Sequence, residues 1–183
     1  MKKIEKLYKK FTKIKDEWRG IDRKILKPVI ALNLIGFRTS GSCEGHLNKN
    51  SPVPWIKISP SLKIKDKNKI LKNCEFKIKK LLKLFYKNKK IINKKAQLVI
   101  TKGNYGFWIH PNKILFKKWR KIVLKSAIFN QNNKNKKIKK LDKIKKEFAF
   151  PKITKKELSV YRKEFNLFAD FILKKFLAKN KVE

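Results

Sequence analysis

The segment QLVITKGNYGFWIH, residues 97–110, carries the clearest folding signal in the sequence. Two runs rich in β-branched and aromatic residues flank Gly103 and Asn104, the residue types that supply the positive φ angles of a tight turn. The segment therefore predicts an antiparallel β-hairpin. Because side chains alternate along a strand, we expect Phe107 on one face of the hairpin and Trp108 on the other.

Two further strands are expected earlier in the chain. Residues 55–58 alternate isoleucine with Trp55 and Lys57, and residues 37–40 form a short strand that leads into a polar loop. Elsewhere, apolar residues recur three and four positions apart, which is the spacing of an amphipathic helix. This spacing predicts helices over residues 2–18, 22–35, 66–90, 114–129 and 154–180.

The ends of two helices are marked by specific residues. Asp22 can cap the second helix, although Pro28 is an alternative starting point for it, since proline is tolerated in a first turn. Gly36 stands where that helix should stop. The final helix follows a capping box formed by Thr154 and Glu157.

Pairs of strands separated by helices predict an α+β fold, with about four mostly antiparallel strands in one sheet covered by helices. We expect a single domain over residues 1–183, with an α+β body at 1–129. Residues 130–153 form a Lys/Asn-rich loop followed by a short helix that ends near Phe148. Residues 154–180 form a long amphipathic packing helix.

The composition is strongly basic, with 52 Lys and Arg against 13 Asp and Glu and a net charge of +39. Such a surface attracts polyanions, including RNA. Only five of the basic residues are arginine, however, and Lys, Asn, Ile and Phe make up more than half of the chain. This skew is typical of AT-rich codon usage. The charge therefore has two explanations, selection for nucleic-acid binding and mutational drift.

No apolar run approaches the roughly 18 residues needed to cross a bilayer, so no membrane insertion is expected. The basic N-terminus is not followed by the apolar stretch of a secretory signal. Two cysteines are too few for a disulfide framework. We therefore expect a cytoplasmic protein, whose oligomeric state the sequence leaves open.

Residues 39–46 (TSGSCEGH) differ from the rest of the chain because they contain no lysine. The same eight positions hold two of the six glycines, one of the two cysteines and one of the two histidines. If drift has pushed the surface toward lysine, a stretch that escaped it is held by a constraint. We therefore place the candidate functional site in this segment.

The segment has the chemistry of an anion site. Two glycines can turn backbone N–H groups inward to form a nest, and nearby hydroxyls and an arginine add donors and charge. Trp55 and His110 are expected as neighbours, although His110 can equally cap its strand. The predicted ligand-binding residues are Arg38, Thr39, Ser40, Gly41, Ser42, Gly45, Trp55 and His110.

Three residues of the segment can act chemically. Cys43 and His46 can serve as nucleophile and base, and Glu44 as acid or base. Cys43 and His46 also have zinc-ligand spacing, and Cys74 with His110 would complete a Cys2His2 set. The structural alternative is a tight turn in which Cys43 is a small buried apolar residue.

The sequence resembles a small uncharacterised family with the pattern D-x-x-I…L-N…G-x-x-T-x-x-S-C-x-G-H followed by P-W. The matching residues are Asp22, Ile25, Leu32, Asn33, Gly36, Thr39, Ser42, Cys43, Gly45, His46, Pro54 and Trp55, with Tyr161, Phe165 and Phe168 similar to that family's last helix. This resemblance implies no particular activity.

The same segment is similar to the T-T-S-S-C-S-G-R motif of the tRNA wybutosine-synthesising methyltransferase family, specifically its third enzyme. Thr39, Ser42, Cys43 and Gly45 match, whereas His46 replaces an arginine. The resemblance implies S-adenosylmethionine as cofactor and a tRNA base as substrate.

Three functions therefore follow from the sequence. The first is binding or modification of a phosphorylated or nucleic-acid ligand at residues 38–46. The second is an S-adenosylmethionine-dependent methyltransferase, and the third is a non-catalytic structural or protein-interaction domain. The cofactor stays open between S-adenosylmethionine, zinc and none.

Overall fold

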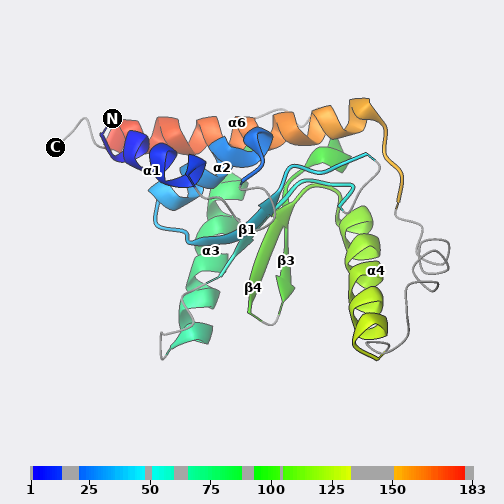
Figure 1. Ribbon diagram of the computed structural model, residues 1–183. Helices are drawn as coiled ribbons and strands as arrows, with labels where there is room; N and C mark the ends of the chain where they lie inside the picture. The colour runs from blue at the N-terminus through cyan, green and yellow to red at the C-terminus, as the bar shows by residue number, and fades with distance from the viewer. Residues whose placement is uncertain are drawn as a thin grey trace.

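The computed structural model describes residues 2–13, 21–47, 51–59, 66–87, 93–103, 105–132 and 151–179. These residues form an α+β fold, as the sequence predicts, in which helices surround one antiparallel sheet (Figure 1). The strands are β1 (Thr39–Cys43), β2 (Trp55–Ile58), β3 (Val99–Gly103) and β4 (Gly106–His110). Their order in the sheet is β1-β2-β4-β3, so the predicted hairpin β3–β4 extends the pair formed by β1 and β2.

Six helical elements accompany the sheet in the described residues. They are α1 (Lys2–Thr12), α2 (Arg23–Leu34), α3 (Lys67–Lys87), the short 3-10 helix η1 (Lys94–Ala96), α4 (Lys113–Asn132) and α6 (Lys155–Lys179). In Figure 1, α6 runs across one end of the sheet with α1 and α2 beside it. None of these helices combines the length and the apolar character needed to cross a membrane.

The main core lies between one face of the sheet and four helices. Ile56 of β2 and Phe107 and Ile109 of β4 are fully buried there. Phe165 and Phe168 meet them from α6, and further buried residues come from α1, α2 and α3. This cluster explains why the apolar stripe of α6 is so regular: that helix packs against α2 along much of its length.

The other face of the sheet carries a smaller aromatic cluster. Phe116 from α4 and Tyr161 from α6 are buried in it, and Trp108 packs at its margin. Trp55 of β2 stacks on Trp119 of α4 with ring centroids 5.9 Å apart. The alternation predicted for the hairpin is therefore confirmed, with Phe107 in the main core and Trp108 on the opposite face.

His110 is completely buried at the end of β4, where its ring stacks on Phe116 at 3.7 Å. Its Nδ1 lies 2.9 Å from the carbonyl oxygen of Pro111 and must donate to it, because a carbonyl only accepts. Its Nε2 then accepts from the hydroxyl of Thr101 at 2.8 Å. Burial, together with the positive charges of Arg120 and Lys113, lowers the pKa of His110 from 6.5 to about 4, against the opposing effect of the Pro111 bond.

The largest departure from expectation concerns the segment after α2. The sequence predicts a strand at 37–40 and then a polar loop, whereas β1 occupies Thr39–Cys43. Its pairing with β2 includes an irregularity between Thr39 and Gly41. The prediction is therefore right at Thr39 and Ser40 but ends too early. Glycine and serine have low strand propensity, so pairing with β2 decides the continuation of the strand through Cys43.

Other expectations at element ends are partly wrong. Helix α2 begins at Arg23 and contains Pro28, so the alternative start at Pro28 is wrong. Asp22 occupies the N-cap position but makes no capping hydrogen bond. Gly36 stops the helix with φ of +89°, as predicted. Gly103 lacks the expected positive φ, and its missing side chain instead leaves room for the ring of Trp108.

Helix α4 extends through Asn132, so the first three residues of the predicted loop at 130–137 are helical. The capping box is confirmed, with Thr154 N–H donating to Glu157 Oε2 at 2.8 Å and Glu157 N–H donating to Thr154 Oγ1 at 3.1 Å. Residues 14–18, 88–90 and 133–148, over which further helix and loop are predicted, lie outside the described residues.

Because His110 is buried and neutral, the free energy of unfolding should decrease as the pH falls. The unfolded chain takes up the proton near pH 6.5, whereas the folded chain resists it until about pH 4, so proton uptake favours unfolding. Between these pH values the wild type should lose about 3 kcal/mol of unfolding free energy that His110→Gln does not lose. Urea titrations across this range measure the difference.

The matched control is His46→Gln, which removes the chain's other histidine and leaves the contribution of His110 in place. This variant should keep the steep acid dependence. Equal pH slopes for the wild type and His110→Gln would contradict a buried neutral imidazole.

Candidate functional site

The lysine-free segment does not form one loop, because β1 separates its two ends. Arg38 is exposed at the start of the strand, and Cys43 ends it about 16 Å away at the usual rise per residue. Thr39 accepts a hydrogen bond from Asn33 at 2.8 Å, and the hydroxyls of Ser40 and Ser59 lie 3.0 Å apart. Thr39 and Ser40, at the start of β1, are therefore hydrogen-bonded to α2 and to the residue after β2.

The predicted anion nest is also not formed as expected. Gly41 lies inside β1, with the ring of Trp55 3.4 Å from the position of a Cβ, so it does not turn the backbone. Ser42 pairs with Ile56 in the same strand pair. Of the two glycines in the segment, only Gly45 has a left-handed backbone, with φ of +76°.

The second half of the segment is a tight turn after β1, residues 43–46. Gly45 is required in it, because a Cβ would lie 2.8 Å from both Leu158 Cδ1 and Pro54 N, besides the strain of a positive φ. The N–H of Gly45 points back to Cys43 Sγ at 3.4 Å. The N–H of His46 donates to the carbonyl of Ser51 at 2.8 Å, which ties the turn to the segment before β2.

Arg162 of α6 clamps this turn from the side. Its Nε donates to the carbonyl oxygen of Glu44 at 2.9 Å, and its Nη2 donates to the carbonyl oxygen of Gly45 at 2.8 Å. The same Nη2 pairs with Glu44 Oε1 at 3.0 Å, and both side chains are only 17% exposed. A planar guanidinium can hold three acceptors in fixed directions, which an ammonium cannot do.

Asp22 reaches the turn from the segment before α2. Its Oδ2 accepts from the backbone N–H of Glu44 at 3.0 Å, which explains why it does not cap its own helix. The backbone N–H of Lys24 donates to Glu44 Oε2 at 3.3 Å. Glu44 is therefore engaged by both α2 and α6, so its carboxylate serves to hold the turn.

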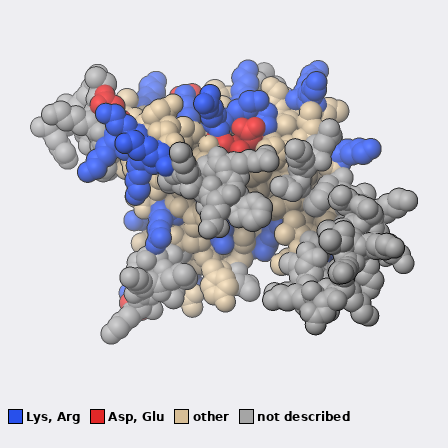
Figure 2. All heavy atoms as spheres, viewed as in Figure 1, with Lys and Arg blue, Asp and Glu red and all other residues tan. Residues whose placement is uncertain are grey.

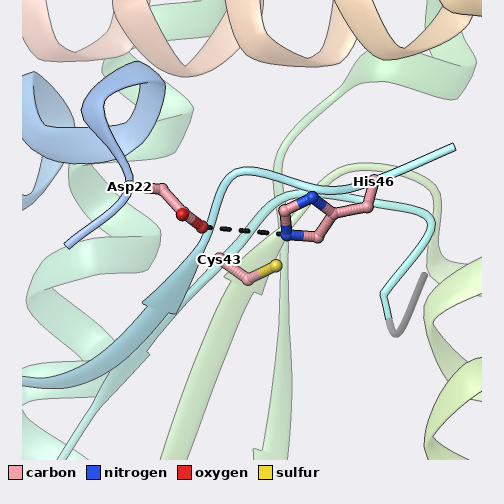
Figure 3. A group of neighbouring side chains, drawn as sticks. All are labelled: Asp22, Cys43 and His46. Atoms are coloured by element: carbon pink, nitrogen blue, oxygen red, sulfur yellow. Dashed lines mark ion pairs between the residues drawn. The ribbon is translucent and has the colours of Figure 1, made fainter. Parts of the chain in front are cut away.

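Asp22, Cys43 and His46 point toward one another, as Figure 3 shows, from the start of α2, the end of β1 and the turn after it. One potential ligand atom from each residue lies within 4.8 Å of the other two. His46 Nε2 is 3.9 Å from Asp22 Oδ2, and these two side chains are 35% and 32% exposed. The cluster thus joins a buried sulfur to two groups that solvent reaches.

Burial is the main reason why the pKa of Cys43 rises to about 11. The negative charges of Asp22 and Glu44 raise it further, whereas the Gly45 N–H and Arg162 lower it. The thiol is therefore protonated at neutral pH, and its surroundings do not prepare Cys43 as a thiolate nucleophile.

The remaining predicted residues lie apart from this cluster. Trp55 is the strand partner of Cys43, but its ring stacks on Trp119. His110 is bonded to Thr101 and Pro111, and Cys74 packs against the main core. Neither joins the only group of potential metal ligands found among the described residues, so a Cys2His2 set is not assembled there.

A groove of about 690 Å³ adjoins the clamped turn along α6. Lys24 lines it from α2 and Leu47 from the end of the turn. Leu158, Arg162 and Lys163 line it from α6. The groove therefore meets the turn through Leu47 and Arg162, whereas Asp22, Cys43 and His46 are not among the residues that line it.

Sequence reasoning did not find Arg162, and it took Asp22 for a helix cap. Arg162 carries the same signal that picked out residues 39–46, because it is the single arginine of α6 in a chain where arginine is scarce. A search for isolated arginines among the lysines would have located Arg162, although it would not have identified Glu44 as its partner.

Comparisons with models of protein families, with curated proteins and with solved structures found no match to this chain.

The clamp predicts a large effect of removing Arg162. Arg162→Leu leaves the mostly buried Glu44 carboxylate without its partner, which should lower the unfolding free energy by about 3 kcal/mol. Arg162→Lys should restore only part of it, because a lysine cannot reach two carbonyls and a carboxylate together. Urea denaturation measures both values.

The neighbouring exposed Lys163 provides the control, and Lys163→Gln should change the unfolding free energy little. An Arg162→Lys protein as stable as the wild type would show that the three-acceptor geometry contributes nothing.

Proposed function

We propose that this protein binds a phosphorylated ligand, and most suitably a segment of nucleic acid, in the groove that α6 forms with Lys24 and Leu47. The observation that carries the proposal is the combination of cationic and apolar side chains along one concave surface. Phosphate groups require the first, and the faces of bases or sugars pack on the second.

The cations of the groove are not all equivalent. Arg162 is engaged by Glu44, and the groove's Asp170 is paired with Lys27. Among the ion pairs between described residues, none involves Lys24, Lys155 or Lys163. These three lysines are therefore the groups that favour an anion in the groove.

The apolar part of the lining comes from Leu47, Leu158 and Leu167. The volume of about 690 Å³ lies within the range of small-molecule and cofactor sites. A nucleotide unit matches this lining better than inorganic phosphate does, because its ring and sugar cover apolar surface that phosphate alone leaves exposed to water.

The surrounding surface supports the same ligand class. Basic side chains lie along the upper edge of the molecule in Figure 2, where α6 runs. The net charge of +39 attracts any polyanion at a distance. The groove adds a place where such a ligand contacts both charge and apolar surface, which a uniformly charged surface does not offer.

A more specific proposal is that the protein chemically modifies the ligand that it binds. With Glu44 committed to the clamp, Cys43 and His46 are the groups of the turn left for chemistry. The S-adenosylmethionine-dependent alternative depends on the sequence resemblance alone, and calorimetry with that cofactor tests it. If the protein is a purely structural domain, substitution of the groove lysines should change no ligand affinity.

Fluorescence anisotropy with a labelled single-stranded RNA tests the groove directly. The double variant Lys24→Gln/Lys163→Gln should bind more weakly than the wild type. It should also lower the slope of log affinity against log salt by about 1.4, because each lost phosphate contact on a single strand accounts for about 0.7.

The matched control is Lys72→Gln/Lys83→Gln, which removes two exposed charges from α3. It changes the net charge equally but touches no residue of the groove, so its salt slope should fall less. Equal losses in the two double variants would mean that binding is diffuse and would overturn the proposal.

The RNA affinity of an Arg38→Gln variant tests which end of β1 lies near the bound ligand. The sequence places Arg38 in the ligand site, whereas it is exposed at the far end of the strand from the groove. We expect this variant to behave like the α3 control. A loss as large as that of the groove variant would move the site to the start of β1.

A further inference from the structure

We infer that Asp22, Cys43 and His46 form a binding site for one zinc-type transition-metal ion, with a fourth coordination position left open. The inference is independent of the proposed ligand groove. It adds Asp22, which the sequence does not mark as a ligand, to the Cys43-x-x-His46 pair.

The distances between the ligand atoms support such a site. Ligands around a tetrahedral zinc ion lie about 3.3–3.6 Å apart, given metal–ligand bonds of about 2.0–2.3 Å. In the protein the three atoms lie within 4.8 Å of one another, and the nitrogen of His46 is 3.9 Å from the oxygen of Asp22. A contraction of about 1.5 Å at most therefore brings them to bonding positions.

The side chains that must move to bind an ion are the two that solvent reaches, Asp22 and His46. Asp22 and His46 are each about one-third exposed, at 32% and 35%, so rotation of their side chains does not disturb the core. Cys43 is fixed at the end of β1 by pairing with Trp55 and provides the rigid corner of the site.

The donor set selects the kind of metal. Thiolate and imidazole ligands favour zinc and similar transition metals, whereas magnesium and calcium require oxygen ligands. Three protein ligands with one position left for water or substrate are characteristic of catalytic rather than structural zinc sites. The open position would take water or an oxygen atom of a bound ligand.

The backbone of the turn already supports two of the ligands. The N–H of Gly45 points to Cys43 Sγ, and the N–H of Glu44 donates to Asp22 Oδ2. Hydrogen bonds of this kind, donated to the ligand atoms by neighbouring groups, orient metal ligands and stabilise their anionic forms. Arg162 holds the carbonyls of Glu44 and Gly45, which fixes the turn from which both N–H groups project.

The local charges also balance once an ion is bound. A divalent ion with the Asp22 carboxylate and the Cys43 thiolate is neutral, and the adjacent Glu44–Arg162 pair is neutral as well. Binding of the ion to the Cys43 sulfur releases the thiol proton to solvent, as metal binding to thiols generally does. No buried charge is left without a partner.

Cobalt(II) titration of the full-length, reduced and chelator-treated protein tests the site. One equivalent should produce a thiolate-to-cobalt charge-transfer band, and zinc should displace it. Cys43→Ser should abolish the band, and Asp22→Asn and His46→Gln should each weaken cobalt binding by about tenfold or more. Cys74→Ser is the matched cysteine control and should leave both the band and the affinity unchanged.

Several outcomes would overturn the inference. They are the absence of a band in the wild type, loss of the band in Cys74→Ser, or unchanged affinity in Asp22→Asn and His46→Gln. The last two variants decide the question if Cys43→Ser fails to fold, since they alter partly exposed side chains. Lys24→Gln/Lys163→Gln should bind cobalt normally, so failure of the groove proposal and failure of the metal site are distinguishable.

Discussion

The three hydrogen bonds from Arg162 to the turn after β1 are the interaction on which the candidate site depends. They join α6 to a turn 117 and 118 positions earlier in the sequence. Asp22 and Ser51 accept further hydrogen bonds from the backbone of this turn. Its one left-handed residue, Gly45, must be glycine to fit beneath Leu158. Helix α6 therefore supplies both the arginine that holds the turn carrying Cys43 and His46 and most of the residues that line the groove.

Much of the fold could be predicted because its signals are local. The hairpin, strand β2 and the capping box of α6 each depend on residues a few positions apart, and each is found where the sequence predicts it. Strand β1 was predicted at residues 37–40, and its continuation through Cys43 was missed because Gly41 and Ser42 have little strand propensity and depend on pairing with β2. The first and last residues of the helices and strands were also hard to predict, because tertiary contacts determine where each element ends.

The site was located in part by contrast with a lysine-saturated background. That contrast identified Cys43, Gly45 and His46, which the turn brings together, but it also included Arg38, which lies at the other end of a strand. Sequence adjacency was mistaken for spatial adjacency because a loop was expected. Asp22 was missed as a neighbour because an acidic residue before a helix has a simpler local explanation as a cap, and only the fold brings it to Glu44.

Amide hydrogen exchange at Glu44, Gly45 and His46 is the decisive measurement, because these N–H groups of the turn donate to Asp22, Cys43 and Ser51 respectively. The account predicts protection similar to that of the β1 and β2 amides in the wild type, and loss of this protection in Arg162→Leu while the β2–β4 amides stay protected. Exchange of the three amides at the rate of an unstructured peptide in the wild type would contradict it.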